Sequence, residues 1–418
     1  MAMDINQVRS KFPALKYPHI FLDNPGGTQV PLQCIDRINE YFLETNANSG
    51  GVFETSRRSD ATVEAARSAM ADFLNASRPE EVAFGMNMTT LTYSVSRAIG
   101  KTFLKAGDTI VITRLDHDGN ISPWLQLADD YQCNIRWVDI NPDDCTIDVN
   151  DFKAAMNEKP KVVAFGYASN ISGTVNPVKE LAKLAHDAGA MVYIDAVQYA
   201  PHGPMDVQDL GVDFLVCSSY KFFGPHLGIL WGKYDLLNQL KAYRVRPSSN
   251  VPPGKFETGT GPFESIAGLL GTLEYLEWLS DSFGADQDSR FAGRYNGRKL
   301  TLKKAMGVLQ SYEHELSRTM MESFSAIPGL QLHGIADVER LNERVPTYSF
   351  THPAMLPKPI AIKLAEQSIN VWAGNFYALA VTTRLDLEGK GGMLRIGAAH
   401  YNTKEEIETV TAALKAIL

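Results

Sequence analysis

Short apolar runs rich in β-branched residues alternate with helical patterns between residues 108 and 233, and this alternation restricts the fold more than any other feature of the sequence. The runs occupy residues 108–115, 134–140, 161–168, 191–196, 212–219 and 228–233. Strands that alternate with helices indicate an α/β architecture with a mostly parallel sheet. Because Val162 to Phe165 is apolar at every position, we expect helices to cover both faces of that sheet.

The pattern changes beyond about residue 284, which indicates a second, smaller α+β unit. A long amphipathic helix is predicted over roughly 290–327. The final helix should begin at Thr403, because Thr403 to Glu406 has the sequence of a capping box. At about 150 residues per domain, 418 residues suggest two domains. We assign an N-terminal segment 1–20 that packs with the small domain, a large domain 21–283 and a small C-terminal domain 284–418.

The charge balance argues against a nucleic-acid or membrane partner. The chain has 40 Lys and Arg against 48 Asp and Glu, a net charge of −8, so it offers no basic footprint to phosphate backbones or anionic lipids. Residues 1–15 lack the apolar core of a signal peptide, and no run of about 18 apolar residues occurs later. We therefore expect a cytoplasmic protein.

The cysteines and histidines indicate neither a disulfide framework nor a metal site. Cys34, Cys133, Cys145 and Cys217 form no CxxC pair, and the 9 histidines contain no HExxH motif. We expect reduced thiols and no bound metal. No cysteine occurs in residues 218–418.

Two ionisable residues lie at the ends of apolar strands. Lys221 follows one predicted strand and precedes the turn Gly224-Pro225, while Asp195 ends another. A lysine and a buried aspartate at the carboxyl ends of parallel strands suit pyridoxal phosphate, because the lysine binds the aldehyde and the carboxylate keeps the pyridine nitrogen protonated. Taken alone, Lys221 also fits a lysine that snorkels from a strand end.

The segment Ser218 to Pro225 resembles the Ser-x-His-Lys-x-x-Gly-Pro motif of class V aminotransferases, a group of fold type I pyridoxal-phosphate enzymes. Within that group the chain resembles the cysteine desulfurases. The resemblance implies a large domain with a mostly parallel seven-stranded sheet, Lys221 as the aldimine lysine and Ser218 as a phosphate ligand. Tyr220 stands where the motif has histidine, and its hydroxyl can still donate a hydrogen bond to the phosphate.

Further segments match the family in the same order along the chain. Thr89 and Thr90 resemble the turn that holds the phosphate at a helix N-terminus, although a threonine there also suits an ordinary N-cap. The resemblance places His117 over the cofactor ring. It places Asn170 at the phenolic oxygen of the cofactor, with Gln198 as a second candidate for that oxygen.

Two more matches concern the partner subunit and the substrate. Thr260 lies in a segment that resembles the loop which places a threonine on the phosphate of the neighbouring subunit. The resemblance therefore implies a homodimer with active sites at the interface. Arg395 resembles the strand arginine whose guanidinium fork binds the substrate α-carboxylate. The alternative is that Arg395 forms a structural salt bridge.

The family pattern breaks at the sulfur acceptor. Cysteine desulfurases take sulfur onto a mobile cysteine of the small domain, shortly before the carboxylate-binding arginine. Tyr377 or a neighbour occupies that place here. A phenol cannot form a persulfide, so we do not expect sulfur transfer onto the protein by the usual route.

The resemblance implies a pyridoxal-phosphate enzyme that acts on an amino acid through a Cα carbanion or quinonoid. Lys221, His117 and Asp195 would be catalytic, and Arg395 and Tyr377 would bind the substrate. A cysteine desulfurase-like C–S β-lyase comes first, because the group acts at Cβ–S. The alternatives are an aminotransferase or a decarboxylative condensation enzyme and, outside enzymes, a cofactor-binding scaffold. A buried lysine and aspartate are costly without the cofactor, which disfavours the scaffold.

Overall fold

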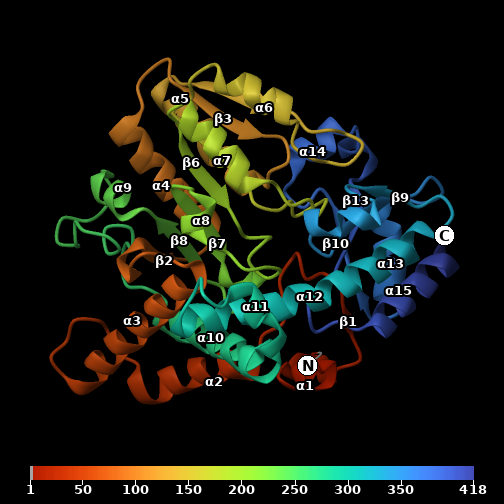
Figure 1. The fold of residues 1–418 in the computed structure, drawn as a ribbon, viewed down its shortest axis with the longest axis horizontal. Helices are drawn as coiled ribbons and strands as arrows, with labels where there is room; N and C mark the ends of the chain where they lie inside the picture. Colours follow the sequence, from red (N-terminus) through yellow and green to blue (C-terminus); the bar gives the residue numbers. More distant parts are fainter. Residues whose placement is uncertain (1–2) are drawn as a thin grey trace.

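A sheet of seven strands forms the centre of the larger part of the molecule (Figure 1). The computed structural model describes residues 3–418, so residues 1–2 of the predicted segment 1–20 lie outside the described residues. The strand order is β2-β8-β7-β6-β5-β3-β4. Strand β8 runs antiparallel to β7 and β2, and the other neighbouring pairs are parallel. The predicted mostly parallel seven-stranded sheet is confirmed.

Six of these strands fall on the apolar runs, and the sequence pattern did not indicate the seventh, β2. The strands are β2 (Val82–Gly85), β3 (Thr109–Thr113), β4 (Asn134–Val138), β5 (Val162–Gly166), β6 (Met191–Asp195), β7 (Phe214–Ser218) and β8 (Gly228–Gly232). The helices of this part are α2 (Leu32–Glu40), α3 (Glu54–Leu74), α4 (Met88–Phe103), α5 (Ser122–Tyr131), α6 (Val149–Met156), α7 (Val178–Asp187), α8 (Val207–Leu210), α9 (Tyr234–Gln239) and α10 (Phe263–Phe283).

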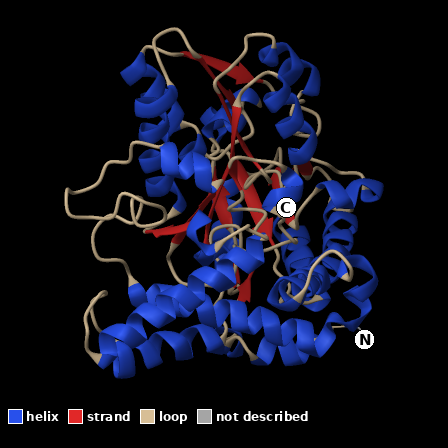
Figure 2. Cartoon of the chain, turned by 60° about the vertical axis from the view of Figure 1, so that its left-hand side comes forward, coloured by secondary structure: helices blue, strands red, loops and turns tan. Residues whose placement is uncertain are grey.

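Helices cover both faces of the sheet, as the continuous apolar strands predicted (Figure 2). Along β5, Val162 and Ala164 pack into one cluster with α4 and α5. Val163 and Phe165 point the other way, into a cluster that includes α3, α7 and α10. Because successive strand residues alternate between the faces, the strand ends are the places where polar side chains can gather without entering either core.

A second, four-stranded sheet lies on the C-terminal side of the molecule, in the order β12-β13-β10-β9 (Figure 1). Its elements are β9 (Gln331–His333), β10 (Thr347–Thr351), β12 (Trp372–Gly374) and β13 (Met393–Gly397), with helices α13 (Pro357–Ala365), α14 (Leu379–Arg384) and α15 (Lys404–Ile417). Thr403 caps α15 in the predicted capping box with Glu406. The domain boundary at residues 283 and 284 stays a prediction.

The helix predicted over roughly 290–327 is wrong at its start. The structure has a short helix α11 (Asp288–Phe291), an irregular segment, and then α12 (Gly297–Ser325). Gly293 and Gly297 have φ values of 84° and 54°. Such left-handed backbone ends a helix, and glycine adopts it without a steric cost.

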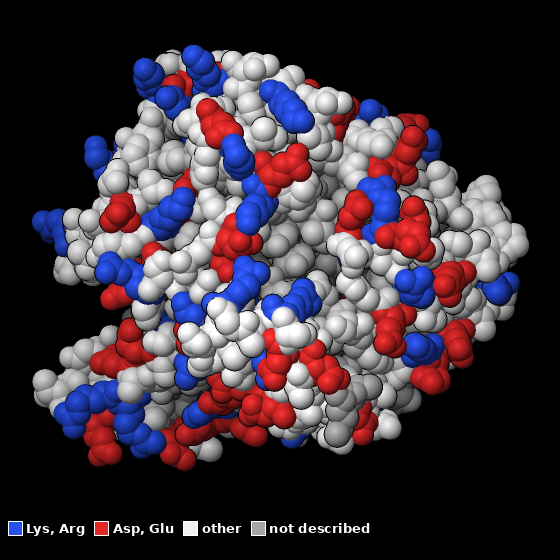
Figure 3. Space-filling view, viewed as in Figure 1, with Lys and Arg blue, Asp and Glu red and all other residues white. Residues whose placement is uncertain are grey.

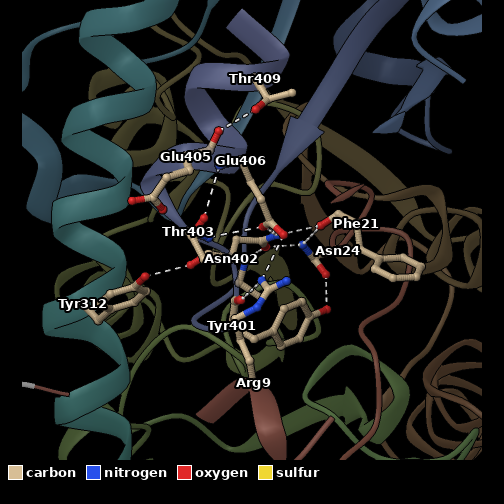
Figure 4. Close-up of polar contacts among 11 residues, drawn as sticks. Arg9, Phe21, Asn24, Tyr312, Tyr401, Asn402, Thr403, Glu405, Glu406 and Thr409 are labelled. Carbon is tan, nitrogen blue, oxygen red and sulfur yellow. Dashed lines mark hydrogen bonds and ion pairs between the residues drawn. The ribbon is translucent and has the colours of Figure 1, made fainter. Parts of the chain in front are cut away.

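The N-terminal segment contacts the C-terminal helix through polar side chains (Figure 4). It contains α1 (Ile5–Ser10) and β1 (Ile20–Phe21), and β1 pairs with β11 (Ile369–Asn370). Arg9 donates to the carbonyl of Tyr401 at 2.7 Å and forms an ion pair with Glu406 at 2.9 Å. These contacts join residues nearly 400 positions apart.

Asn24 is the centre of this network (Figure 4). Its amide group lies within hydrogen-bond distance of the carbonyl oxygens of Phe21 and Gly397 and of the side-chain oxygen of Asn402, at 2.9, 2.8 and 3.0 Å. Its own oxygen accepts from the hydroxyl of Tyr401. Because Asn24 is buried, these bonds fix the backbone of the loop that follows β1.

The surface carries both signs of charge. Figure 3 shows lysine and arginine interspersed with aspartate and glutamate over the face seen in Figure 1. Among residues 3–418, no helix has the length and apolar character needed to span a bilayer. The same part of the chain holds no group of three or more potential metal ligands.

The Asn24 network predicts a measurable loss of stability. Asn24→Ala leaves buried carbonyl and hydroxyl groups without partners and should lower the free energy of unfolding by about 2 kcal/mol or more in urea denaturation. The control is Thr409→Ala on the exposed side of α15, which should stay within about 0.5 kcal/mol of the unmodified protein. Equal unfolding midpoints for the two variants would contradict the role of Asn24.

Candidate active site

A cavity of about 940 Å³ opens at the carboxyl ends of the parallel strands and extends to the second sheet. The predicted site residues that line it are Thr89, Thr90, His117, Asn170, Asp195, Gln198, Ser218, Tyr220, Lys221, Tyr377 and Arg395. Ligands of open α/β sheets bind at this edge, because the strand ends and the helix N-termini meet there. Residues far apart in sequence are thus brought to one cavity.

Asp195 ends β6 and is buried at the floor of the cavity. Its carboxylate accepts a hydrogen bond from the backbone amide of Val197 at 2.9 Å. Burial raises the pKa of Asp195 to about 7, against the opposing effects of this hydrogen bond and of Lys221. A carboxylate held in this way is stabilised by a cationic group placed next to it.

A second buried carboxylate, that of Asp116, lies close to Asp195 and was missed by sequence reasoning. Burial raises the pKa of Asp116 to about 8, and the charge of Asp195 adds to the rise. Asp116 accepts hydrogen bonds from Thr113 and, at 2.8 Å, from Asn120. These bonds fix the loop that carries His117. The signal was available, because Asp116 follows the apolar strand β3 much as Asp195 ends β6.

Lys221 enters the cavity from the 3-10 turn η5 (Ser219–Lys221), directly after β7. Its ammonium group donates to the carbonyl of Pro25 and lies 4.8 Å from the ring centroid of Tyr220. Burial, reinforced by the positive charge of Arg395, lowers the pKa of Lys221 to about 7. Lys221 can therefore exchange a proton near neutral pH, which an exposed lysine does not do.

Arg395 reaches the cavity from the middle of β13 and is held by three contacts. It pairs with Asp23 at 3.1 Å, donates to the carbonyl of Asn170 at 3.1 Å and lies 4.3 Å from the ring centroid of Phe376. The ion pair is the structural salt bridge that the sequence left open as an alternative, yet among residues 3–418 the Nε atom of Arg395 finds no partner, although it is buried. The sequence did not indicate that Asp23 belongs to the site. Burial raises the pKa of Asp23.

His117 is stacked against Tyr377 at the mouth of the cavity, with ring centroids 5.5 Å apart. Its Nδ1 atom accepts from the amide of Gly119 at 2.9 Å, so the neutral ring carries its proton on Nε2. Burial lowers the pKa of His117 to about 4, with further lowering by Lys221. Near neutral pH, His117 is therefore an uncharged donor.

Tyr377 belongs to a loop in which two successive residues have left-handed backbone. Phe376 and Tyr377 have φ values of 55° and 59°. The loop is held by Asn170, which donates to the carbonyl of Phe376 at 2.8 Å, and by the amide of Asp118, which donates to the carbonyl of Tyr377 at 2.6 Å. This conformation costs free energy for residues other than glycine, so the surrounding contacts must stabilise it.

The N-terminus of α4 forms another wall of the cavity. Its N-cap is Asn87, whose side chain accepts from the amide of Thr90 at 2.9 Å, so neither Thr89 nor Thr90 is the cap. The hydroxyl of Ser218 accepts from the amide of Met88 at 3.0 Å and thereby joins the end of β7 to this helix. Amides at a helix N-terminus favour an anion.

The cavity fits pyridoxal phosphate by the chemistry of its donors. It holds a lysine with a lowered pKa, a buried aspartate and a helix N-terminus, and each of these suits a different part of that cofactor. Within the part of the chain that the structure describes, the Oδ1 atom of Asn170 and the Nε atom of Arg395 are buried without hydrogen-bond partners. Gln198 also faces the cavity, where its amide donates to Thr347 at 3.0 Å. Unpartnered buried atoms in a cavity indicate that a ligand completes it.

Thr260 and the cysteines lie outside the cavity lining. Thr260 is exposed and follows Gly259, which has a φ of 75°. Its placement on a partner's phosphate stays a prediction. Three cysteines are buried, and Cys133 is half-buried. Burial raises the pKa of Cys34 to about 11 and that of Cys145 to about 12, and it raises the pKa of Cys217 well above its usual range.

Comparisons with known proteins agree with this geometry. The model of the aminotransferase class-V family matches residues 20–294 and 297–410. A cysteine desulfurase of Synechococcus elongatus is 33% identical over 435 residues that cover 100% of this chain, and the chain spans 64% of that protein's length. An aminotransferase-like protein of Gibberella zeae is 30% identical, with 100% of this chain and 99% of that protein covered. The apo structure of a cysteine desulfurase from Thermococcus onnurineus has a TM-score of 0.85 at 26% identity, covering 100% and 99% of the two chains.

The lowered pKa of Lys221 predicts how the protein without cofactor captures pyridoxal phosphate. A pKa of about 7 means that the neutral amine fraction increases about tenfold between pH 6 and pH 8, so the rate of covalent capture should increase with pH over that range. Borohydride trapping at each pH, followed by peptide mass analysis, measures the rate and identifies the lysine. Lys221→Ala should trap no cofactor, whereas the exposed-site control Lys179→Ala should behave as the unmodified protein. Trapping on another lysine would overturn the assignment.

Proposed function

Because this chain belongs to the class V aminotransferase family of pyridoxal-phosphate enzymes, we propose that it cleaves the bond between Cβ and sulfur, or a related substituent, of an amino acid. Its fold is the fold type I architecture expected from the sequence. One observation carries the proposal: Lys221, Asp195 and Arg395 meet in one cavity that no thiol lines. The cavity thus has the groups for chemistry at Cα but no acceptor for sulfur.

The residues that would hold the cofactor come from α4, β6, β7, η5 and the loops that carry His117, Asn170 and Gln198. Lys221 would bind its aldehyde and Asp195 its ring nitrogen, with His117 over the ring. Thr89, Thr90, Ser218 and Tyr220 would bind the phosphate, and Asn170 and Gln198 the phenolic oxygen. When bound, the cofactor withdraws electrons from Cα of an attached amino acid. Asp195 keeps this withdrawal strong, because its negative charge stabilises the protonated ring nitrogen.

Arg395 would bind the α-carboxylate of the substrate. Its Nε atom is free to donate, and Asp23 with the ring of Phe376 keeps the guanidinium in place. A guanidinium fork recognises a carboxylate in a fixed orientation, so this contact would fix the orientation of the substrate in the cavity that Lys221 also lines. Tyr377 would cover the side-chain end of the substrate, because it forms the outer wall next to His117.

Proton transfers follow from the protonation states of Lys221 and His117. Lys221, with its pKa near 7, accepts the proton from Cα. The Nε2 proton of His117 is available to the sulfur that leaves Cβ with the bonding electron pair. With L-cysteine, the products are 2-aminoacrylate and hydrogen sulfide, and water converts the former to pyruvate and ammonia. One cysteine and one water therefore give one pyruvate, one ammonia and one sulfide.

The buried thiols predict which products form from L-cysteine. No thiolate reaches the cavity, so the purified enzyme should release sulfide and pyruvate in equal amounts, with no protein persulfide and no alanine as the main product. Sulfide, pyruvate, ammonia, alanine and CO₂ are measured together in one incubation, alongside a panel of other amino acids. A variant with all four cysteines changed to alanine, checked for folding, should keep the activity, and Lys221→Ala should lose it.

Other outcomes of the same experiment identify the alternatives. Stoichiometric alanine with a trapped persulfide would contradict the proposal and show a relocated sulfur acceptor. Amino-group transfer to a keto acid without sulfide would indicate an aminotransferase. CO₂ release with a condensation product would indicate decarboxylative condensation. If no amino acid changes the absorption spectrum of the bound cofactor, the protein would be a scaffold.

We propose in addition that the protein is a homodimer whose sites are completed by Thr260 of the partner subunit. Thr260 is exposed on a loop whose Glu257 is anchored to Arg67 at 2.6 Å, so the base of the loop is fixed while its tip is free of the cavity of its own chain. Exposed apolar side chains elsewhere in the chain include Leu43, Val52 and Met86. Such side chains suit an interface between copies.

The dimer proposal predicts the activity of mixed dimers. In a dimer of one Lys221→Ala and one Thr260→Ala subunit, trans placement puts both changes in one site and leaves the other site intact. Random mixing of the two variants, each impaired as a homodimer, should therefore restore about a quarter of the unmodified activity and cofactor content, since half the dimers are mixed. Sedimentation analysis of the unmodified protein should give the mass of a dimer. Without any recovery in mixed dimers, a trans threonine is excluded.

A further inference from the structure

We propose that His226 binds the phosphate group of the cofactor, with Tyr220 holding its ring in place. This inference rests on the cofactor site proposed above. His226 lies outside every motif singled out in the sequence, yet it lines the same cavity as Lys221. Its imidazole stacks on the phenol ring of Tyr220, with centroids 4.9 Å apart and an interplanar angle of 22°.

The backbone on both sides of His226 is fixed by one buried residue. Ser219 donates its hydroxyl to the carbonyl of Pro225 and its amide to the carbonyl of Leu227 at 2.9 Å. The turn after Lys221 closes on the same serine, because the amide of Gly224 donates to its carbonyl at 2.8 Å. The backbone at His226 is therefore fixed on both sides, and the imidazole lies over the ring of Tyr220.

This position is next to the N-terminus of α4. Gly228 begins β8 directly against Asn87, the N-cap of α4, and a Cβ atom on Gly228 would lie 2.4 Å from the carbonyl carbon of Asn87. Gly228 is also the register partner of Ser218, whose hydroxyl bonds the first amide of the helix. His226, two residues before Gly228, thus stands beside the proposed phosphate ligands.

The surroundings of Tyr220 leave space for its ring to stack on the imidazole of His226. A Cβ atom on Gly27 would lie 3.3 Å from the Tyr220 ring, so the glycine leaves space that a larger residue would take. The carbonyl of Tyr220 accepts from the amide of Thr28 at 3.1 Å, which fixes its backbone. The phenol is thereby held between the loop of Gly27 and the imidazole of His226.

The other basic residues of the cavity lining have other roles in the proposed function. These are Lys221, bonded to Pro25, Arg395, paired with Asp23, and His117, which burial keeps uncharged. Among residues 3–418, the ring nitrogens of His226 form no hydrogen bond. A phosphate dianion is best bound by donors that add to those of a helix N-terminus, and an imidazole N–H is such a donor. His226 is the basic residue left to supply it.

The test compares the binding of pyridoxal phosphate with that of pyridoxal, which lacks the phosphate. His226→Phe keeps an aromatic ring for the stack but removes both donors, and His226→Gln keeps a donor without the ring. His19→Phe, at an exposed site outside the cavity lining, is the matched control. Dissociation constants come from absorbance titrations of the proteins stripped of cofactor, and the phosphorus NMR shift of bound pyridoxal phosphate gives a second readout. Thermal unfolding of each variant checks its fold.

We expect His226→Phe to weaken pyridoxal phosphate about tenfold or more while pyridoxal binds as before. His226→Gln should recover part of the loss, and the phosphorus shift should move in His226→Phe. Equal affinity of all variants for pyridoxal phosphate would overturn the proposal. Equal weakening of both ligands would also overturn it, because it would mean a structural role. Failure of the unmodified protein to bind pyridoxal phosphate would instead contradict the proposed function.

Discussion

Five ionisable side chains, three of them buried and two half-buried, lie together where the parallel strands end, and the rest of the structure is arranged around this constraint. Asp195 ends β6, Asp116 follows β3, which β5 separates from β6, and Lys221 follows β7. Arg395 comes from the second sheet, and Asp23 comes from the N-terminal loop. Buried charges are tolerated only when they are paired or hydrogen-bonded. Each of the five has a polar partner in the chain, and the partner often comes from a distant segment.

The loop from Asp23 to Gly27 satisfies two of these charges at once. Asp23 pairs with Arg395, and the carbonyl of Pro25 accepts from Lys221. Asn24, which lies between Asp23 and Pro25, is hydrogen-bonded to Tyr401 and Asn402, just before the C-terminal helix (Figure 4). The N-terminal loop, the large sheet and the C-terminal helix are therefore joined at the site, because Asn24 directly precedes Pro25, whose carbonyl accepts from Lys221.

The sequence predicted most of the local features, with Asp116 as an exception, and missed those that depend on long-range contacts. Lys221 and Asp195 were found because a polar residue at the end of an apolar strand is conspicuous without any tertiary information. Asp23 was missed, because its partner Arg395 lies 372 positions away. The start of the long helix was misplaced because the pattern of apolar residues continues through Gly293, whereas the backbone there is left-handed.

The loop at Tyr377 occupies the place where a sulfur-accepting cysteine would be expected, and it forms a wall of the cavity. Two successive residues in left-handed backbone are held from the large sheet by Asn170 and by the amide of Asp118, beside His117. Such strain persists only where the surroundings over-determine it. A loop that carries sulfur away from the substrate must move, whereas this one is pinned at two backbone carbonyls and stacked on His117. A fixed aromatic wall suits the retention of a substrate side chain, and it leaves a released sulfide to diffuse into solvent.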